Sequence, residues 1–365
     1  MKQLLYRFIE RGTEWLFRRQ FIGTQLLKYG IAILVATLGL DVALGAEYKS
    51  GDTSFAVRVS TGSGLPALAT NFAYALGVFL VFLGVGLLIR QILLDIRKER
   101  RQLLIVVELR GLHNAPDTPA KDVILQEFLG HRQNIVIDFR PQVAGERVNP
   151  QLVLEKMASL MHTIRTLASG RDSADVFVAV GGLAAVPALF LAGALLGDES
   201  NITIFDWSRD LKAWRIPDGP DDGKRFLPVD TTGLATGCQE AVLVVSCSYD
   251  VPAQQVATAF AGIPVVRLDA EEKVADRFWS EQKQAAFVKE FRDAVQQLLN
   301  HGVKRIHVLV AAPVSLSIRM GMTYDGRLHP DVIVYQYESS VLPVYPWGLS
   351  MPNDRHHHPA IIRIA

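Results

Sequence analysis

The sequence is poor in the features that identify most enzymes. It contains two cysteines, Cys238 and Cys247, in 365 residues, which is too few for a disulfide framework and fits a reducing cytoplasm. It has neither the G-x-G-x-x-G pattern of dinucleotide-binding folds nor a Walker A motif. Dinucleotide oxidoreductases and nucleoside triphosphatases are therefore disfavoured. The net charge of +1 identifies no partner, and we expect no DNA binding.

Candidate catalytic and metal-binding groups are also sparse. A predicted loop contains Arg110, His113 and Asp117. No nucleophile stands at a spacing from them that would indicate a catalytic site, so an ordinary polar loop is the favoured interpretation. Three consecutive histidines, His356 to His358, do not share one helical face, which favours a surface run over a metal site. We therefore predict no catalytic residue, no metal and no cofactor.

Two long apolar stretches lie near the start of the chain. The 23 residues Phe72–Leu94 carry no charge before Arg90. As a helix they would reach about 34 Å, whereas a hydrocarbon core is about 30 Å thick. The stretch Tyr29–Ala46 would reach about 27 Å and contains Asp41, so it is the weaker candidate. We predict two transmembrane helices within residues 29–96, joined by the short loop 47–71.

The charges beside these stretches predict their orientation. Residues 1–28 carry a net charge of +4 and residues 97–101 a net charge of +3, whereas the charges of the loop cancel. Basic flanks remain in the cytoplasm, so both termini of this multi-pass protein are predicted to be cytoplasmic. A cleaved signal peptide fits poorly, because the charged region before the first stretch is too long.

Two membrane features leave alternatives open. Residues 1–28 mix apolar residues with Arg and Glu, which is typical either of a span's flank or of an amphipathic helix on the cytoplasmic leaflet. Asp41 is either an interfacial carboxylate or a pore candidate that faces neighbouring chains or a hydrated path. Small residues, including Gly77 and Gly84, would allow close helix approach.

The rest of the chain contains an internal repeat. The segments Val176–Trp207 and Ile306–Tyr337 have equal length and the same plan of apolar strand, small-residue turn, helix, loop and apolar strand. Their strands are continuous Val/Ile/Leu runs, which is typical of parallel sheets covered on both faces. We predict an α/β fold of two tandem Rossmann-like units, residues 97–237 and 238–365, facing one another as a pseudo-dimer. Residues 212–237 would connect them.

Ligands of such sheets bind beyond the carboxyl ends of the strands. A small-residue turn before a helix allows close backbone approach and offers unpaired N–H groups to an anion, although it can also simply pack a strand against a helix. Two such turns in tandem indicate a composite pocket for a multi-phosphate ligand with repeated parts. The predicted ligand-binding residues are Arg110, Gly181, Gly182, Leu183, Ser248, Tyr249, Pro313, Ser315, Arg319 and Tyr337. Trp207, Arg209 and Trp214 either line this pocket or cap the first core.

Several short motifs resemble a known family. In the second half they are Ala311-Ala312-Pro313, Gly321, Val334–Glu338 and Tyr345–Leu349; in the first, Gly181-Gly182-Leu183, Pro187, Phe205–Trp207 and Trp214. These motifs resemble SAVED domains, which are tandem fusions of two CARF-like units that bind cyclic oligonucleotides in bacterial antiphage defence. Two preceding spans are similar to the two-transmembrane SAVED effectors of CBASS systems.

The resemblance implies a receptor without catalysis. Its activating ligand would be a cyclic oligonucleotide of the cyclic tri-adenylate type, made by a CD-NTase. Binding would drive homo-oligomerisation, and the spans would then disrupt the lipid bilayer of the bacterial inner membrane, causing abortive infection. The alternative is a membrane-tethered hydrolase that degrades its own nucleotide ligand.

Overall fold

The computed structural model describes residues 22–37, 67–111, 118–128, 130–141, 147–197, 201–231, 233–234 and 237–364. The chain divides into two compact units, Met1–Arg100 and Arg101–Ala365, and each is described by itself.

The first unit contains two apolar helices, α2 (Ile22–Thr37) and α3 (Ala67–Arg101). Within the described residues, the segment Asn71–Arg101 is long and apolar enough to cross a membrane, and it contains the second predicted span. α2 has 16 residues. Its described part includes residues 22–28, which the sequence assigned to the segment flanking the first span. Residues 1–21 and 38–66, including Asp41, lie outside the described residues.

Glycines bring α2 and α3 together at two levels. A Cβ atom on Gly84 would lie 2.8 Å from the carbonyl oxygen of Gly23, and one on Gly30 would lie 2.9 Å from that of Gly77. The two pairs show that the helices run in opposite directions, with the backbones in close approach. Gly77 and Gly84 thus lie at a helix contact of the kind the sequence predicted, and their partners are glycines of α2.

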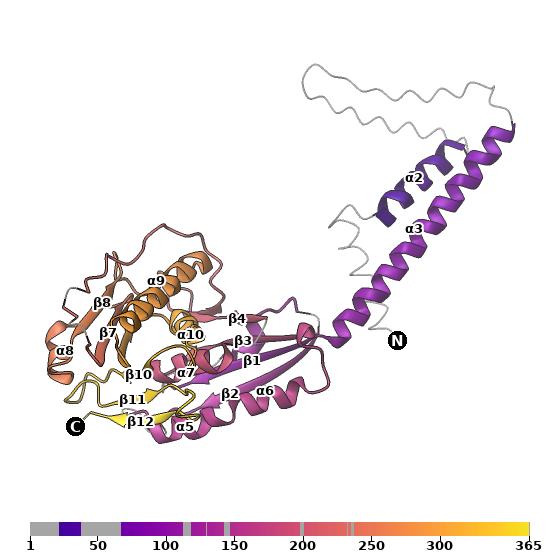
Figure 1. Ribbon diagram of the computed structural model, residues 1–365. Coiled ribbons are helices and arrows are strands. Elements are labelled where there is room, and N and C mark those ends of the chain that lie inside the picture. Colours follow the sequence, from indigo (N-terminus) through magenta and orange to yellow (C-terminus); the bar gives the residue numbers. More distant parts are fainter. Residues whose placement is uncertain are drawn as a thin grey trace, which may run out of the picture. The chain divides into compact units, whose positions relative to one another are not determined.

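The second unit begins with a parallel sheet. Its strands are β1 (Leu103–Arg110), β2 (His131–Asp138), β3 (Val176–Leu183) and β4 (Ile202–Ile204), in the order β2-β1-β3-β4 (Figure 1). The helical segments of this half are α4 (Ala120–Val123), α5 (Pro150–Ala158), α6 (Leu160–Ala168), the 3₁₀ turn η1 (Ser173–Asp175) and α7 (Val186–Leu196). The first seven residues of β1 are buried, as expected for a strand covered on both faces.

A second sheet repeats this order and extends it. Strands β7 (Glu240–Ser246), β8 (Val265–Asp269), β9 (Arg305–Ala311) and β10 (Asp331–Gln336) are parallel, and β11 (Trp347–Ser350) and β12 (Ala360–Arg363) add an antiparallel edge. The helices of this half are α8 (Ala253–Ala259), α9 (Glu281–Asn300) and α10 (Val314–Met322). The order β8-β7-β9-β10 matches β2-β1-β3-β4, so the predicted pair of Rossmann-like units is confirmed. A small hairpin, β5 (Asp206–Ser208) and β6 (Ala213–Arg215), follows the first sheet.

The two halves meet through their equivalent helices, α7 and α10 (Figure 1). A Cβ atom on Gly193 of α7 would lie 2.0 Å from the carbonyl oxygen of Ile318, and one on Gly321 of α10 would lie 2.1 Å from that of Phe190. Gly193 thus lies against Ile318, three residues before Gly321, and Gly321 lies against Phe190, three residues before Gly193. This reciprocity describes a local two-fold relation between the halves, and one hydrophobic core includes residues of both.

The halves differ in the helix before the central strand. The sequence predicts one long helix in each half, over Gln151–Leu167 and Lys283–Leu299, and α9 is continuous in the second. In the first half, however, the helix is divided into α5 and α6 at Ser159, whose Oγ donates to the carbonyl oxygen of Lys156 at 3.0 Å. Serine competes for backbone acceptors in this way and therefore favours helix ends over helix interiors.

Candidate functional site

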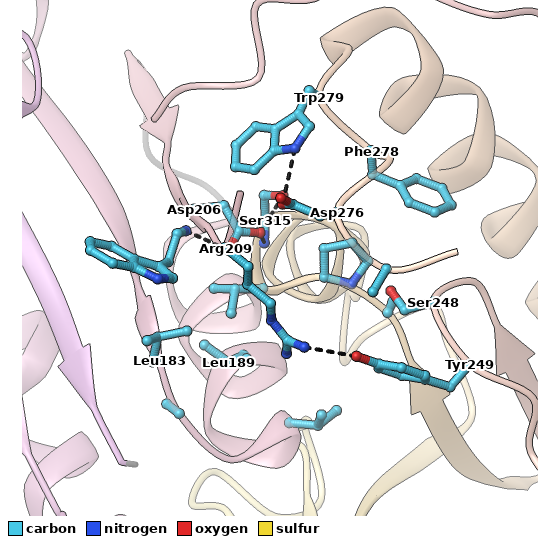
Figure 2. A pocket seen from close by; sticks show the side chains of 17 residues that line it. Leu183, Leu189, Asp206, Arg209, Ser248, Tyr249, Asp276, Phe278, Trp279 and Ser315 are labelled. Atoms are coloured by element: carbon cyan, nitrogen blue, oxygen red, sulfur yellow. Dashed lines mark hydrogen bonds between the residues drawn. The ribbon is translucent and has the colours of Figure 1, made fainter. Parts of the chain in front are cut away.

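A pocket of about 180 Å³ lies where the two halves meet, at the carboxyl ends of β3 and β9 (Figure 2). The first half contributes the β3–α7 turn and the start of the β5–β6 hairpin. The second half contributes the residues after β7, the loop before α9 and the β9–α10 turn. The lining residues are Leu183, Ala184, Val186, Leu189, Asp206, Trp207, Arg209, Ser248, Tyr249, Ala275, Asp276, Phe278, Trp279, Ala312, Pro313, Val314 and Ser315.

The carboxylate of Asp206 caps the start of α10 from the opposite half. Its Oδ2 accepts hydrogen bonds from the backbone N–H and the hydroxyl of Ser315, both at 2.9 Å. The N-cap residue of α10, Pro313, makes no side-chain cap of its own. Since helix N-termini attract negative charge, Asp206 already occupies the anion position that the sequence predicted for a ligand phosphate.

Gln336 makes the reciprocal cap in the other half. Its Oε1 accepts a hydrogen bond from the backbone N–H of Val186, the first residue of α7, at 3.1 Å. Asp206 and Gln336 occupy equivalent places in the two halves. Asp206 stands four residues after Ile202, which pairs β4 with β3, and Gln336 stands four residues after Val332, which pairs β10 with β9. The two caps therefore obey the same local symmetry but differ in charge. The start of α10 faces a carboxylate, whereas the start of α7 faces a neutral amide.

The pKa of Asp206 reflects this buried position. Burial raises the pKa of its carboxyl to about 6, although the hydrogen bonds from Ser315 and Trp207 act in the opposite direction, and the charge of Asp276 raises it further. Part of the Asp206 population is thus protonated in mildly acidic solution.

This raised pKa predicts a pH-dependent contribution to stability. The protonated carboxyl is favoured by folding, so its contribution is fully present below pH 4 and is lost as the pH rises through about 6. The change is about 3 kcal/mol, from roughly two pKa units. Relative to Asp206→Asn, which does not titrate, the wild-type protein should gain thermal stability when the pH falls from 7.5 to 5. Melting of both full-length proteins in detergent measures this, and a stability difference independent of pH would contradict it.

Hydrogen bonds between lining residues and their neighbours join the two halves at the pocket. Arg209 donates from Nη1 to the hydroxyl of Tyr249 at 2.8 Å, which joins the two halves (Figure 2). Asp276 accepts from the indole N–H of Trp279 at 3.0 Å and from the backbone N–H of Asp210 at 3.2 Å. Among the described lining residues, Arg209 is the only cation, and its side chain is exposed.

The structure brings together half of the ligand-binding residues predicted from sequence. Leu183, Ser248, Tyr249, Pro313 and Ser315 line the pocket. Two others lie beside it in packing roles. A Cβ atom on Gly181 would lie 2.2 Å from the carbonyl oxygen of Phe205, and one on Gly182, whose φ is +146°, would lie 2.1 Å from that of Leu109. These glycines allow neighbouring strands to approach, whereas the alternative given by the sequence was the packing of a strand against a helix.

The remaining predicted residues have partners away from the pocket lining. Arg110 donates to the fully buried Glu108 at 2.6 Å, and Arg319 donates to Glu281 at 2.9 Å. The ring of Tyr337 packs against Tyr345, with the ring centroids 5.6 Å apart. Both arginines are thus engaged in ion pairs with neighbouring carboxylates, and neither lines the pocket.

The other residues singled out in the sequence have different surroundings. Trp207 and Arg209 line the pocket, whereas Trp214 is buried beside Phe205 in the first half. His113 and Asp117 lie outside the described residues, and the histidines at 356–358 are exposed. No group of three or more potential metal ligands occurs in the described part of the chain. Sequence reasoning missed Asp206, Asp276 and Trp279, although the equivalence of Asp206 and Gln336 in the repeat was a usable signal.

Comparison with known families identifies the second unit. The profile of the "SMODS-associated and fused to various effectors sensor domain", SAVED, matches residues 161–351, more than half of the chain. The chain belongs to the SAVED family. The profile of the "SAVED-fused 2TM effector domain" matches residues 1–154. The chain therefore joins a SAVED sensor domain to a two-transmembrane effector domain, which associates it with a membrane. The boundary between the matches falls after β2, although β1 and β2 belong to the first sheet of the SAVED unit.

Solved SAVED structures are distantly similar in sequence. The Cap4 SAVED/CARF-domain containing receptor of Acinetobacter baumannii with 2'3'3'-cAAA is 12% identical, with a TM-score of 0.48; the match covers 78% of this chain and 60% of that one. The same receptor with 3'3'3'-cAAA is 11% identical, with a TM-score of 0.45 and the same coverage. The Moraxella osloensis Cap4 receptor is 13% identical, with a TM-score of 0.43 and coverage of 77% and 60%. This chain thus spans about three fifths of those receptors, and no curated protein matches it.

Proposed function

We propose that this protein is a membrane effector of CBASS antiphage defence, activated by a cyclic oligonucleotide that binds between the two halves of its SAVED domain. The observation that carries the proposal is the composite pocket at the carboxyl ends of β3 and β9, in a sensor domain joined to a two-transmembrane effector. Open parallel sheets bind ligands at this edge. The Cap4 receptors solved with cyclic trinucleotides favour a ring of the tri-adenylate type, made by a CD-NTase.

The pocket suits part of such a ligand rather than all of it. Its volume of about 180 Å³ is below the roughly 300–1,000 Å³ of sites that enclose a drug-sized molecule. A cyclic trinucleotide would therefore lie across the mouth, where Arg209 and Tyr249 are exposed. Arginine suits phosphate recognition because its planar guanidinium offers several donors. Of the residues predicted from sequence, Leu183, Ser248, Tyr249, Pro313 and Ser315 would form the floor and walls.

The proposed cellular arrangement follows the charge pattern of the sequence. The basic flanks of the two apolar stretches place both termini in the cytoplasm and the short loop on the other side of the inner membrane. Ligand binding in the cytoplasm would then act on the spans, with Asp41 as a pore candidate, and membrane damage would end the infection together with the cell.

A ligand panel tests this function directly. Full-length protein in detergent is mixed with cyclic di-, tri- and tetranucleotides, and its melting temperature is recorded. At 100 times its Kd a ligand adds about 2.7 kcal/mol of stability, which is easily measured. The ligand is recovered after long incubation and analysed by mass spectrometry. An intact ligand supports a receptor, whereas a linearised one supports the alternative of a membrane-tethered hydrolase; no shift with any ring would refute the proposed ligand class.

The proposal also predicts assembly. Two helices per chain cannot enclose a pore, so several chains must gather for membrane damage. We expect saturating ligand to convert small oligomers of the detergent-solubilised protein into larger ones, through a head-to-tail contact that does not close. Multi-angle light scattering with and without ligand measures the change in mass. An identical mass in both samples would contradict this prediction.

A further inference from the structure

The pocket has a charge that is unfavourable for phosphate. Its described lining contains two carboxylates, Asp206 and Asp276, and one cation, Arg209. The guanidinium is exposed at the mouth and already donates to Tyr249. Asp206, in contrast, is only 6% exposed. Phosphates of a ligand would be repelled from this interior, so an uncharged part of the ligand must enter it.

The walls of the pocket suit a flat ring. Aromatic surface comes from both halves, from Trp207, Tyr249, Phe278 and Trp279. Trp279 is held in place by the hydrogen bond that its indole N–H donates to Asp276 (Figure 2). Bases of every kind stack favourably on aromatic side chains. The volume of about 180 Å³ slightly exceeds the roughly 150 Å³ of a cavity that admits benzene. The space therefore accommodates one base rather than a whole nucleotide ring.

Asp206, in the pocket lining, has an unused position for accepting a hydrogen bond. Oδ2 of Asp206 is engaged by Ser315, but in the described chain Oδ1 accepts only the backbone N–H of Trp207, at 2.8 Å. A carboxylate oxygen offers two acceptor positions, so one remains on Oδ1. The pocket thus combines stacking surfaces with a buried acceptor, and it needs a ring that carries a donor.

We infer that this pocket receives one nucleobase of the ligand, and that Asp206 is a specificity-determining residue that accepts a hydrogen bond from an exocyclic amine of that base. Adenine, cytosine and guanine carry such an amine, whereas unsubstituted purine and uracil do not. The inference rests on the proposed function, because it assumes a nucleotide ligand. A hydrogen bond to a charged acceptor contributes about 1.5–3 kcal/mol, which corresponds to roughly 10-fold or more in affinity.

Paired ligands test the inference without any mutation. Calorimetry of the full-length protein compares cyclic tri-adenylate with the same ring in which purine replaces adenine. We expect the adenine ring to bind at least about 10-fold more tightly. In Asp206→Asn the neutral amide is a weaker acceptor, so the ratio should shrink to about 3-fold or less. The control Asp293→Asn removes an exposed carboxylate of α9, paired with Lys289, and should keep the wild-type ratio.

The outcomes separate this inference from the proposed function. If both rings bind the wild-type protein equally well, or if the ratio is the same in Asp206→Asn, the role of Asp206 is wrong while the receptor function stands. If neither ring binds, the proposed function fails and this inference with it. Because the wild-type comparison needs no variant, the inference is tested even if Asp206→Asn does not fold.

Discussion

Arg209→Glu should weaken binding of cyclic tri-adenylate about 100-fold. The side chain is the only cation among the described lining residues, and it donates to Tyr249 across the mouth, where phosphates would lie. Reversing the charge of this side chain would remove a charge-assisted hydrogen bond to a ligand phosphate, worth about 1.5–3 kcal/mol, and would add repulsion between Glu and that phosphate. Since Arg209 is exposed, the fold should persist. Isothermal calorimetry of full-length protein in detergent measures the loss.

A matched control distinguishes a local contact from a general effect of charge. Arg292 lies exposed on α9 and does not line the pocket. Arg292→Glu should change the affinity less than about 3-fold, because salt screens the interaction between this charge and the ligand phosphates. Equal losses in both variants would indicate long-range electrostatics. Wild-type affinity in Arg209→Glu would remove Arg209 from the site.

Gly321→Val should cause a large loss of stability in the SAVED domain. Even the Cβ atom alone would lie 2.1 Å from the carbonyl oxygen of Phe190 and 3.1 Å from the backbone nitrogen of Ala194. Both neighbours are backbone atoms of α7, so neither can swing away. Overpacking costs about 1–3 kcal/mol and occasionally more, and here we expect at least about 3 kcal/mol. That corresponds to a fall in melting temperature of roughly 6–12 °C.

The same melting experiment includes a glycine with free space around it. Gly233→Ala introduces a Cβ atom with no neighbour within 4 Å, so its melting temperature should stay within about 2 °C of wild type. A Gly321→Val protein that melts like this control would show that α7 and α10 do not pack as described. Gly193→Val, which meets Ile318 at 2.0 Å, should behave like Gly321→Val because the two sites are equivalent.

The layout of the fold could be read from local sequence because its signals are local. Continuous apolar runs indicated buried parallel strands, and the order of the central strands in the two sheets agrees with the repeat. The division of the helix at Ser159 was missed, since the apolar spacing continues through it and a single serine decides the break.

The candidate site was less predictable because its contacts join residues far apart in the chain. Asp206 caps Ser315 across 109 positions, and Gln336 caps Val186 across 150. Nothing local to any of these residues signals such a partner. Arg319 was chosen as a cation near a strand end, but the pairing with Glu281 depends on how α9 packs beside α10. Arg209 was noted in the sequence, and only the placement of the hairpin directs it to the pocket mouth.

Dye release from liposomes reports whether ligand binding to the SAVED domain permeabilises a membrane. Full-length protein is reconstituted into vesicles with its SAVED domain outside, and cyclic tri-adenylate is added. We expect rapid release with ligand, no release without it, and no release for Arg209→Glu at the same protein loading and ligand concentration. Release that does not depend on ligand, or ligand binding without release from wild-type protein, would contradict a ligand-gated membrane effector.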